Sequence, residues 1–220
     1  MNSIDLFSGA GGLLIAKKNL GCNILFANEI DDACAITHRH NFKDIPLIHK
    51  DIKDLKIDEI KQYVGDKEVD LVVGGPPCQG FSLKGKKLGL EDSRNYLFKE
   101  YLAIVQAINP EFIVMENVKA LTNKTNEYFL NQILLGLKNM GFFVQYKVLN
   151  AKDFGVPQSR ERIFIIATKK QAFDFNTIEK KPLVTVADAI SDLHFLVSGD
   201  GQFLQDYPTL PQSDYQLEMR

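Results

Sequence analysis

The sequence predicts a doubly wound α/β domain whose mostly parallel sheet ends in an antiparallel hairpin. Three observations favour this fold class. Short β-prone apolar runs alternate with longer amphipathic stretches through roughly the first 140 residues. Two of the runs, Val69–Val73 and Phe112–Glu116, are almost continuously apolar, as in strands covered on both faces. After Gly141, two strand patterns follow each other with no helix between them, which permits an antiparallel hairpin.

The spacing of apolar residues predicts each strand and each helix separately. Apolar β-prone composition predicts strands at Ser3–Phe7, Asn23–Asn28, Leu47–His49, Val69–Val73, Phe112–Glu116, Phe142–Leu149 and Arg162–Thr168. Amphipathic spacing predicts helices at Gly11–Asn19, Asp32–Asn41, Ile57–Val64, Arg94–Ile108, Glu127–Met140 and, as a short one, Thr185–Leu193. Residues 197–220 are rich in Gly, Pro, Gln and Asp without a sustained period. We therefore expect one domain at 1–196 and a linker or tail at 197–220.

The composition is that of an ordinary globular chain, with 220 residues, 45% hydrophobic and 25% charged. No apolar run approaches the roughly 20 residues that cross a bilayer, and the start MNSIDLFSG lacks the basic and long apolar parts of an export signal. We therefore expect a cytoplasmic protein without membrane contact, whose three cysteines are free thiols. The net charge of −2 weakens a DNA-binding hypothesis without excluding it, because contact surfaces are local.

The first expected strand runs into the turn Asp5-Leu-Phe-Ser-Gly-Ala-Gly-Gly-Leu. Its glycines at 9, 11 and 12 allow a tight strand-to-helix turn and close approach of a ligand, although such turns also occur without ligands. Glu29 ends the second strand on the order of 20 residues later, where nucleotide-binding sheets carry an acid for ribose hydroxyls. Asp51 follows the third strand in the equivalent place. The combination favours an adenosine ligand, and the departure from G-x-G-x-x-G disfavours NAD.

The segment GGPPCQGFS, residues 74–82, holds Cys78 behind two prolines and between glycines. Each proline fixes φ, removes a backbone donor and restricts the residue before it. A structural cysteine needs no such frame, because it is usually buried among aliphatic side chains. Rigid presentation of one thiol suggests a nucleophile, and a tight turn with an incidental cysteine remains the alternative.

Two further segments carry charged groups beside the expected crevice. Glu116 ends an apolar strand in MENV, so it should meet Cys78 at the carboxyl edge of the sheet, partly desolvated and able to carry a proton. The alternative is a strand-end Glu that points into water. In Pro157-Gln-Ser-Arg-Glu-Arg-Ile, period two puts Gln158, Arg160 and Arg162 on one face. Two cations on one face suit a phosphate or a base edge, or form an ordinary charged sheet edge.

Taken in order, IDLFSGAGGL, GGPPCQGFS, EDSRNYLF, MENV and VLNAKDFGVPQSRERIF resemble the DNA cytosine-5 methyltransferase family over residues 3–195. The resemblance implies a Rossmann-like fold dependent on S-adenosylmethionine. It also implies methyl transfer to carbon 5 of a cytosine flipped out of double-stranded DNA, with S-adenosyl-L-homocysteine as product. Such activity belongs to DNA methylation in restriction-modification systems.

The resemblance also assigns roles to the residues. Cys78 is implied as the nucleophile that adds to carbon 6, and Glu116 as the group that donates to ring nitrogen 3. Arg162 is implied to hold the cytosine carbonyl oxygen, supported by Arg160 and Gln158. Phe7, Gly9 and Gly11 are implied to approach the methyl donor, with Glu29 on its ribose and Asp51 on its adenine amino group. The remaining cofactor residues implied are Ala10, Gly12, Ile30, Ile52, Pro77 and Leu97.

The family pattern also implies a missing part. Members continue into a target-recognition domain and return with C-terminal segments that help close the methyl-donor site. Here YPTLPQSDYQLEMR is similar to the segment just before that domain, and the printed sequence ends with it. We therefore expect a chain that is incomplete alone, with a second polypeptide as a possible partner, or a truncated product.

Three other functions remain to be weighed. A tRNA cytosine-5 methyltransferase would carry the same motifs. A catalytically silent subunit that binds S-adenosylmethionine is disfavoured by the intact Cys78, Glu116 and Arg162. A cysteine hydrolase needs a nearby histidine base, and no histidine falls in a motif segment. The four histidines show no metal-ligand spacing with the cysteines, so we expect no metal. Cys22 and Cys34 are expected to be buried small hydrophobes.

Overall fold

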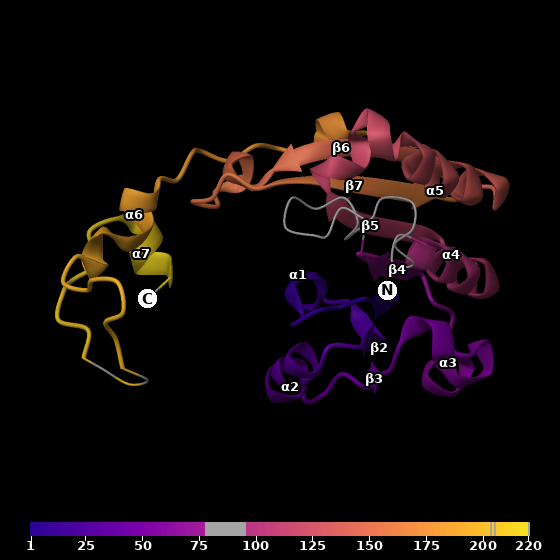
Figure 1. Cartoon of the computed structure of the whole chain (residues 1–220), viewed down its shortest axis with the longest axis horizontal. Coiled ribbons are helices and arrows are strands. Elements are labelled where there is room, and N and C mark those ends of the chain that lie inside the picture. Colours follow the sequence, from indigo (N-terminus) through magenta and orange to yellow (C-terminus); the bar gives the residue numbers. More distant parts are fainter. Residues whose placement is uncertain (78–95, 203, 205, 220) are drawn as a thin grey trace. The chain divides into compact units, whose positions relative to one another are not determined.

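The computed structural model describes residues 1–77, 96–202, 204 and 206–219 (Figure 1). The described residues form one seven-stranded sheet in the order β3-β2-β1-β4-β5-β7-β6. Its strands are β1 (Asn2–Leu6), β2 (Asn23–Glu29), β3 (Leu47–His49), β4 (Leu71–Gly74), β5 (Phe112–Val118), β6 (Phe143–Asn150) and β7 (Glu161–Thr168). Strands β1 to β5 pair in parallel, whereas β7 runs antiparallel to β5 and β6 lies beside it at the sheet edge. The predicted fold class is therefore confirmed.

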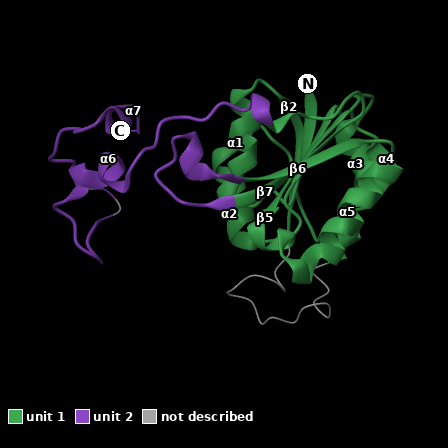
Figure 2. Ribbon diagram, turned by 90° about the horizontal axis from the view of Figure 1, so that it is seen from above, with its two compact units in different colours: residues 1–148, 162–175 green, residues 149–161, 176–220 purple. Residues whose placement is uncertain are grey.

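Five helices cover the two faces of this sheet: α1 (Gly12–Asn19), α2 (Asp32–Asn41), α3 (Ile57–Val64), α4 (Leu97–Ile108) and α5 (Glu127–Asn139). Two further helices of the described residues, α6 (Val186–Ile190) and α7 (Asp214–Met219), follow later in the chain. Helices α1 and α2 lie on one face and α3, α4 and α5 on the other (Figure 2). The core follows this division, because Leu14 and Phe42 belong to one buried cluster and Ile60, Tyr101 and Ile133 to another.

Several element boundaries differ from the predicted ones. Strand β4 begins at Leu71 instead of Val69, and the preceding Asp70 accepts the Asn2 backbone N–H with its carboxylate (2.7 Å). Thr185 is the N-cap of α6 and shares a capping box with Asp188, so it stands just outside the helix. A helix was predicted at Arg94–Ile108, and its first two residues lie outside the described ranges. Among the described residues, this helix is α4, which begins at Leu97.

The predicted tail contains a helix that periodicity did not indicate. In α7 the buried Gln216 donates to Ser191 Oγ (2.9 Å) and accepts the Gln212 N–H (2.6 Å). Polar contacts of this kind leave no apolar period in the sequence, and for that reason the segment resembled a linker. Cys22 and Cys34 are half-buried and free, so the expectation of full burial was wrong.

The described residues divide into two compact units, residues 1–148 with 162–175 and residues 149–161 with 176–220 (Figure 2). The first unit contains α1 to α5 and most of the sheet. The second contains α6 and α7, joined where Ser213 Oγ donates to the Asp188 carbonyl (2.6 Å). The residues that the sequence assigned to a methyl donor all belong to the first unit.

Strand β1 has two different faces. Ile4 and Leu6 are fully buried in the larger apolar cluster, whereas Asp5 points to the other face, where Lys17 of α1 places its Nζ 3.0 Å from Asp5 Oδ2. Burial raises the pKa of Asp5 and lowers the pKa of Lys17, because desolvation disfavours both charged forms. Removal of either side chain would leave the other buried charge without a partner. This ion pair fixes the first helix behind the turn that joins it to β1.

Candidate methyl-donor and base site

The parallel strands bring the predicted site residues to one edge of the sheet. Strand β1 ends at Leu6, β2 at Glu29, β3 at His49 and β4 at Gly74, so the loops after all four lie at their carboxyl ends. Between β3 and β4 the chain crosses from one side of β1 to the other. Ligands of doubly wound sheets bind at such a switch point.

The turn after β1 has the open conformation that its glycines predicted. Phe7, Gly9 and Gly11 all have positive φ, of 59°, 56° and 102°. A Cβ at Gly11 would collide with the Phe42 ring, so only glycine fits there, whereas a Cβ at Gly9 or Gly12 would meet nothing within 4 Å. The backbone beside Gly9 and the exposed Ala10 is therefore accessible to a ligand.

Glu29 holds this turn to the end of β2. Its Oε2 accepts the Gly9 N–H (2.8 Å), and its Oε1 accepts the N–H groups of Ile30 and Asp31 (2.8 Å each). The carboxylate is therefore preorganised by three backbone donors that come from both sides of the crevice. Oε1 is thus occupied by two donors, whereas Oε2 keeps one acceptor site to which a ribose hydroxyl can donate.

The residues predicted around an adenine differ in exposure. Asp51 follows β3 by two residues and caps a short 3₁₀ helix, Ile52–Asp54, by accepting the Lys53 N–H (3.0 Å). Ile52 is only 3% exposed and belongs to the core, whereas Ile30 is 57% exposed. Leu97 packs against the core from the start of α4. Of the two isoleucines, Ile30 therefore presents the larger apolar surface to solvent.

Glu116 and Arg162 meet across the antiparallel pair of β5 and β7. Their strands are in register with Val118 opposite Arg162 and Glu116 opposite Phe164, so the two residues form a diagonal pair on one face. Arg162 Nε lies 2.9 Å from Glu116 Oε1, and the two side chains are 23% and 28% exposed. Sequence analysis placed both residues at one crevice but did not predict this ion pair.

The loop that leads to Cys78 is anchored beside Glu116. A Cβ at Gly74 would lie 2.6 Å from the Leu6 carbonyl oxygen, and a Cβ at Gly75 would lie 3.3 Å from Glu116 Oε2. Asn117, which sequence analysis missed, donates from Nδ2 to the Pro76 carbonyl (2.8 Å) and is buried. Its only sequence signal was its position directly after Glu116.

The described residues therefore follow the loop past Gly75, which lies beside the Glu116 carboxylate, as far as Pro77. Cys78 itself lies outside the described residues.

Gln158 and Arg160 do not share the strand with Arg162. Strand β7 begins at Glu161, so both residues precede it, and the strand from which their common face was predicted does not extend to them. Asn150 organises this loop instead: its Oδ1 accepts the N–H groups of Lys152 (3.3 Å) and Arg160 (3.0 Å). The Gln158 N–H turns back to the Val156 carbonyl (2.7 Å), which interrupts the strand alternation.

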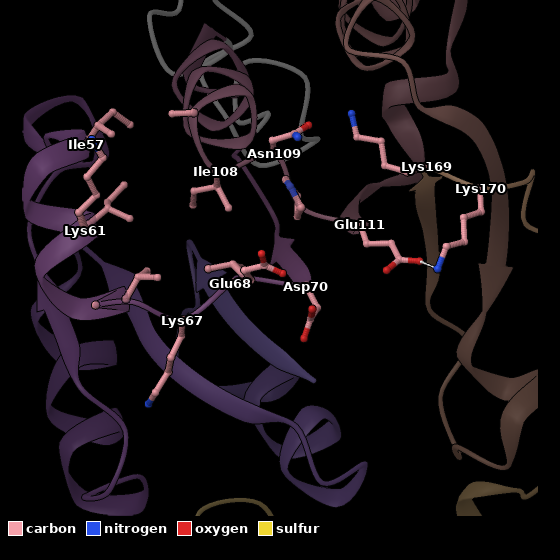
Figure 3. A pocket seen from close by; sticks show the side chains of 16 residues that line it. Ile57, Lys61, Lys67, Glu68, Asp70, Ile108, Asn109, Glu111, Lys169 and Lys170 are labelled. Atoms are coloured by element: carbon pink, nitrogen blue, oxygen red, sulfur yellow. Dashed lines mark ion pairs between the residues drawn. The ribbon is translucent and has the colours of Figure 1, made fainter.

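A pocket of about 890 Å³ lies at the opposite end of the strands, where β4 and β5 begin and β7 ends (Figure 3). It is bordered by Asp70 before β4, Glu111 before β5 and Lys170 after β7. Two of its charged groups, Lys170 and Glu111, form an ion pair with each other at 2.5 Å. We assign it no function. Within the described ranges, no three acidic, cysteine or histidine side chains are grouped to hold a metal ion.

No helix among the residues described in the structure has the length and apolarity to span a membrane.

The fold is that of solved α/β methyltransferases. Among solved structures, a DNA modification methyltransferase encoded within an E. coli prophage matches 90% of this chain and 56% of its own, with 31% identity and a TM-score of 0.78. A mutant of the Spodoptera frugiperda DNMT2 covers 84% of this chain and 54% of its own, with 30% identity and a TM-score of 0.63.

The sequence comparisons define the family. The chain belongs to the C-5 cytosine-specific DNA methylase family, whose sequence model matches residues 1–214. The Type II methyltransferase M1.HphI of Haemophilus parahaemolyticus is 37% identical over 98% of this chain and 59% of its own length. The Type II methyltransferase M.DdeI of Desulfomicrobium norvegicum is 38% identical over 100% of this chain and 55% of its own length. The chain thus spans a little over half of these relatives.

One relative is close to this chain in extent. The Type II methyltransferase M.AquIA of Picosynechococcus is 40% identical over 86% of this chain, and the match covers 88% of that protein.

Proposed function

We propose that the chain is the catalytic part of a DNA (cytosine-5)-methyltransferase of a restriction-modification system. It would transfer the methyl group of S-adenosylmethionine to carbon 5 of a cytosine flipped out of double-stranded DNA. The observation that supports this most directly is the Glu116–Arg162 pair, 2.9 Å apart, beside the backbone that leads to Cys78. Family membership supports the same chemistry.

The proposed chemistry begins at carbon 6 of the base, because carbon 5 is a poor nucleophile until something adds there. The Cys78 thiolate forms a bond to carbon 6, and the electron pair of the 5,6 double bond becomes available at carbon 5. Carbon 5 then takes the methyl group as the methyl–sulfur bond of the donor breaks and leaves S-adenosyl-L-homocysteine. Loss of the carbon 5 proton to solvent restores the double bond and expels the thiolate.

Glu116 and Arg162 would act on the polar edge of the base. Glu116 donates a hydrogen bond or proton to ring nitrogen 3, which offsets the charge that develops as the thiolate adds. Arg162 contributes donors to the carbonyl oxygen at position 2, and in the structure it also orients the carboxylate through Oε1. Arg160 and Gln158 support this loop, whose start at Asn150 is closed by the Arg160 backbone.

The residues at the carboxyl ends of β1, β2 and β3 support a methyl-donor site. The open space at Gly9 and Gly12 admits a ligand close to the backbone, and Glu29 presents a carboxylate already fixed by three N–H groups. In this proposal Glu29 takes the ribose hydroxyls, Asp51 the adenine amino group, and the exposed Ile30 one face of the adenine ring. S-adenosylmethionine supplies the methyl group.

We further propose that a second polypeptide supplies the target-recognition domain and the C-terminal segments, and that the enzyme acts in the cytoplasm. In this arrangement residues 1–196 are the catalytic domain, and residues 197–220 lead towards the recognition domain. M.AquIA, a relative covered to 88% of its length, is of similar extent and is itself called a Type II methyltransferase. Base-edge contacts carry sequence specificity, so the chain alone should bind DNA with little preference.

Transfer of tritiated methyl groups from S-adenosylmethionine tests the function. Purified chain, with and without a polypeptide that carries the recognition region, is incubated with DNA, with tRNA and with neither. We expect label in DNA only when both polypeptides are present. Label in tRNA alone would assign an RNA substrate, and robust sequence-specific DNA methylation by the chain alone would contradict the need for a partner.

A trapping experiment tests the nucleophile. DNA that contains 5-fluorocytosine should hold the methylating preparation in a covalent adduct, because fluorine blocks the final elimination. Cys78→Ala should form no adduct, whereas Cys22→Ala and Cys34→Ala should form it at the wild-type level. An adduct that survives Cys78→Ala would refute the mechanism.

A further inference from the structure

His49 ends β3 at the edge of the methyl-donor crevice, and it contacts the turn that follows β2. Its Nε2 lies 3.1 Å from the Ile30 carbonyl oxygen and 3.3 Å from Asp32 Oδ1. Its Nδ1 lies 3.4 Å from Nη2 of Arg39, one of the last residues of α2. The imidazole therefore joins β3 both to helix α2 and to the backbone immediately after Glu29.

The neighbours decide which imidazole nitrogen carries the proton. A guanidinium group can only donate, so Nδ1 must be the acceptor towards Arg39. The ring hydrogen then resides on Nε2, which donates to the Ile30 carbonyl with Asp32 as a second acceptor. The contact with Ile30 is thus a directed hydrogen bond from the ring and is not a chance approach.

The backbone that carries His49 is held from the inside of the sheet. Asn28, which is 1% exposed, donates from Nδ2 to the carbonyls of Ile48 (3.0 Å) and Lys50 (2.9 Å), one on each side of His49. The Lys50 N–H in turn donates to the Glu29 carbonyl (3.1 Å). His49 therefore projects from a fixed position, and the Ile30 carbonyl that it binds is fixed with it.

The turn 29–31 is thus held by two sets of contacts. Its N–H groups at Ile30 and Asp31 bind Glu29 Oε1, and its carbonyl at Ile30 binds His49. Without the His49 contact, the peptide between Ile30 and Asp31 would lose the partner of its carbonyl and could rotate. Rotation of that peptide would move the Asp31 N–H away from the Glu29 carboxylate.

We propose that His49 is a positioning residue for the methyl-donor site, which keeps the Glu29 carboxylate aimed at the ribose hydroxyls by holding the Ile30 carbonyl. The inference rests on the proposed function, since it assumes that Glu29 binds the ribose. His49 does not touch the ligand in this proposal.

Calorimetric titration with S-adenosylhomocysteine tests the proposal on the purified chain. We expect His49→Ala to weaken the affinity about tenfold, the equivalent of one hydrogen bond. His49→Gln, whose amide nitrogen reaches the Nε2 position, should stay within about threefold of wild type. His49→Asn, which extends only to the Nδ1 position, should resemble His49→Ala. His40→Ala, an exposed histidine of α2, is the matched control and should bind as wild type does.

A second ligand separates positioning from general loosening of the fold. The 2′,3′-dideoxy analogue of S-adenosylhomocysteine has no hydroxyls for Glu29, so wild type and His49→Ala should bind it equally. Equal losses for both ligands, rescue by Asn instead of Gln, or wild-type affinity in His49→Ala would each overturn the role of His49. Failure of the wild-type chain to bind S-adenosylhomocysteine even with the second polypeptide present would overturn the proposed function, and this inference with it.

Discussion

Arg162 lies diagonally across the β5–β7 pair from Glu116, with its Nε 2.9 Å from Glu116 Oε1. The two residues are far apart in the sequence, and only the antiparallel register of β7 brings them together. The geometry leaves Glu116 Oε2 on the side of Gly75, where the chain leads to Cys78. One cation thus orients the carboxylate that would act on the base.

Glu116→Gln tests the proton-donor role. The amide oxygen can still accept from Arg162, but the side chain cannot give a proton to ring nitrogen 3, so we expect methyl transfer by the methylating preparation to fall by about 10²-fold or more. Affinity for S-adenosylhomocysteine should stay within about twofold. Glu111→Gln, also ion-paired and located at the other end of β5, should keep wild-type activity. Undiminished transfer by Glu116→Gln would exclude the role.

Glu29→Ala should weaken cofactor binding and also lower the free energy of unfolding. It removes charge-assisted contacts with the ribose, worth roughly 1.5–3 kcal/mol. It also leaves the N–H groups of Gly9, Ile30 and Asp31 without their acceptor. Calorimetric titration and urea unfolding measure the two effects, with the exposed Glu127→Ala as the control. Equal affinity for wild type and Glu29→Ala would refute the ribose assignment.

Gly74→Ala should lower the free energy of unfolding, whereas Gly12→Ala should not. A Cβ at Gly74 would press on the Leu6 carbonyl and the Tyr101 ring, so we expect a loss of about 1–3 kcal/mol. Gly12 begins α1, has open space around it and no positive φ, so alanine there should be neutral or add about 0.4–1 kcal/mol. Urea unfolding without ligand measures the free energy of unfolding of both variants. A Gly74→Ala variant as stable as wild type would contradict the close packing of β4 on β1.

Asp31 should make stability depend on pH in acid. The Cys34 backbone N–H, which Asp31 accepts at the N-cap of α2, lowers the pKa of this carboxyl below its ordinary value. Its ionised form therefore stabilises the fold above the unfolded-state pKa of about 3.9, and this contribution is lost as the pH falls through the lower folded-state pKa.

Urea midpoints between pH 7 and pH 3 provide the measurement for Asp31. The advantage of wild type over Asp31→Ala should shrink below about pH 4. The advantage of Asp31→Asn over Asp31→Ala should stay constant, because asparagine caps the helix without titrating. A wild-type advantage that is independent of pH would show that the charge at Asp31 contributes nothing.

The sequence by itself determined the order of the elements and the residues at the ends of the strands. Helices at Asp32–Asn41 and Ile57–Val64 were predicted to the residue, because periodicity and capping depend only on neighbours along the chain. Glu29 was placed at the end of its strand for the same reason. The glycine turn was also predictable, since positive φ at Gly9 and Gly11 is a local property.

Only the tertiary structure decided which of these residues meet and in what geometry. The Glu116–Arg162 pair follows from strand register, and the Asn117 bond to Pro76 and the Asp5–Lys17 ion pair follow from packing between distant elements. His49 gave no signal in the sequence, because its partners come from β2 and α2. Local propensity and period describe near neighbours, whereas sheet order, register and side-chain contacts depend on the free energy of the whole fold.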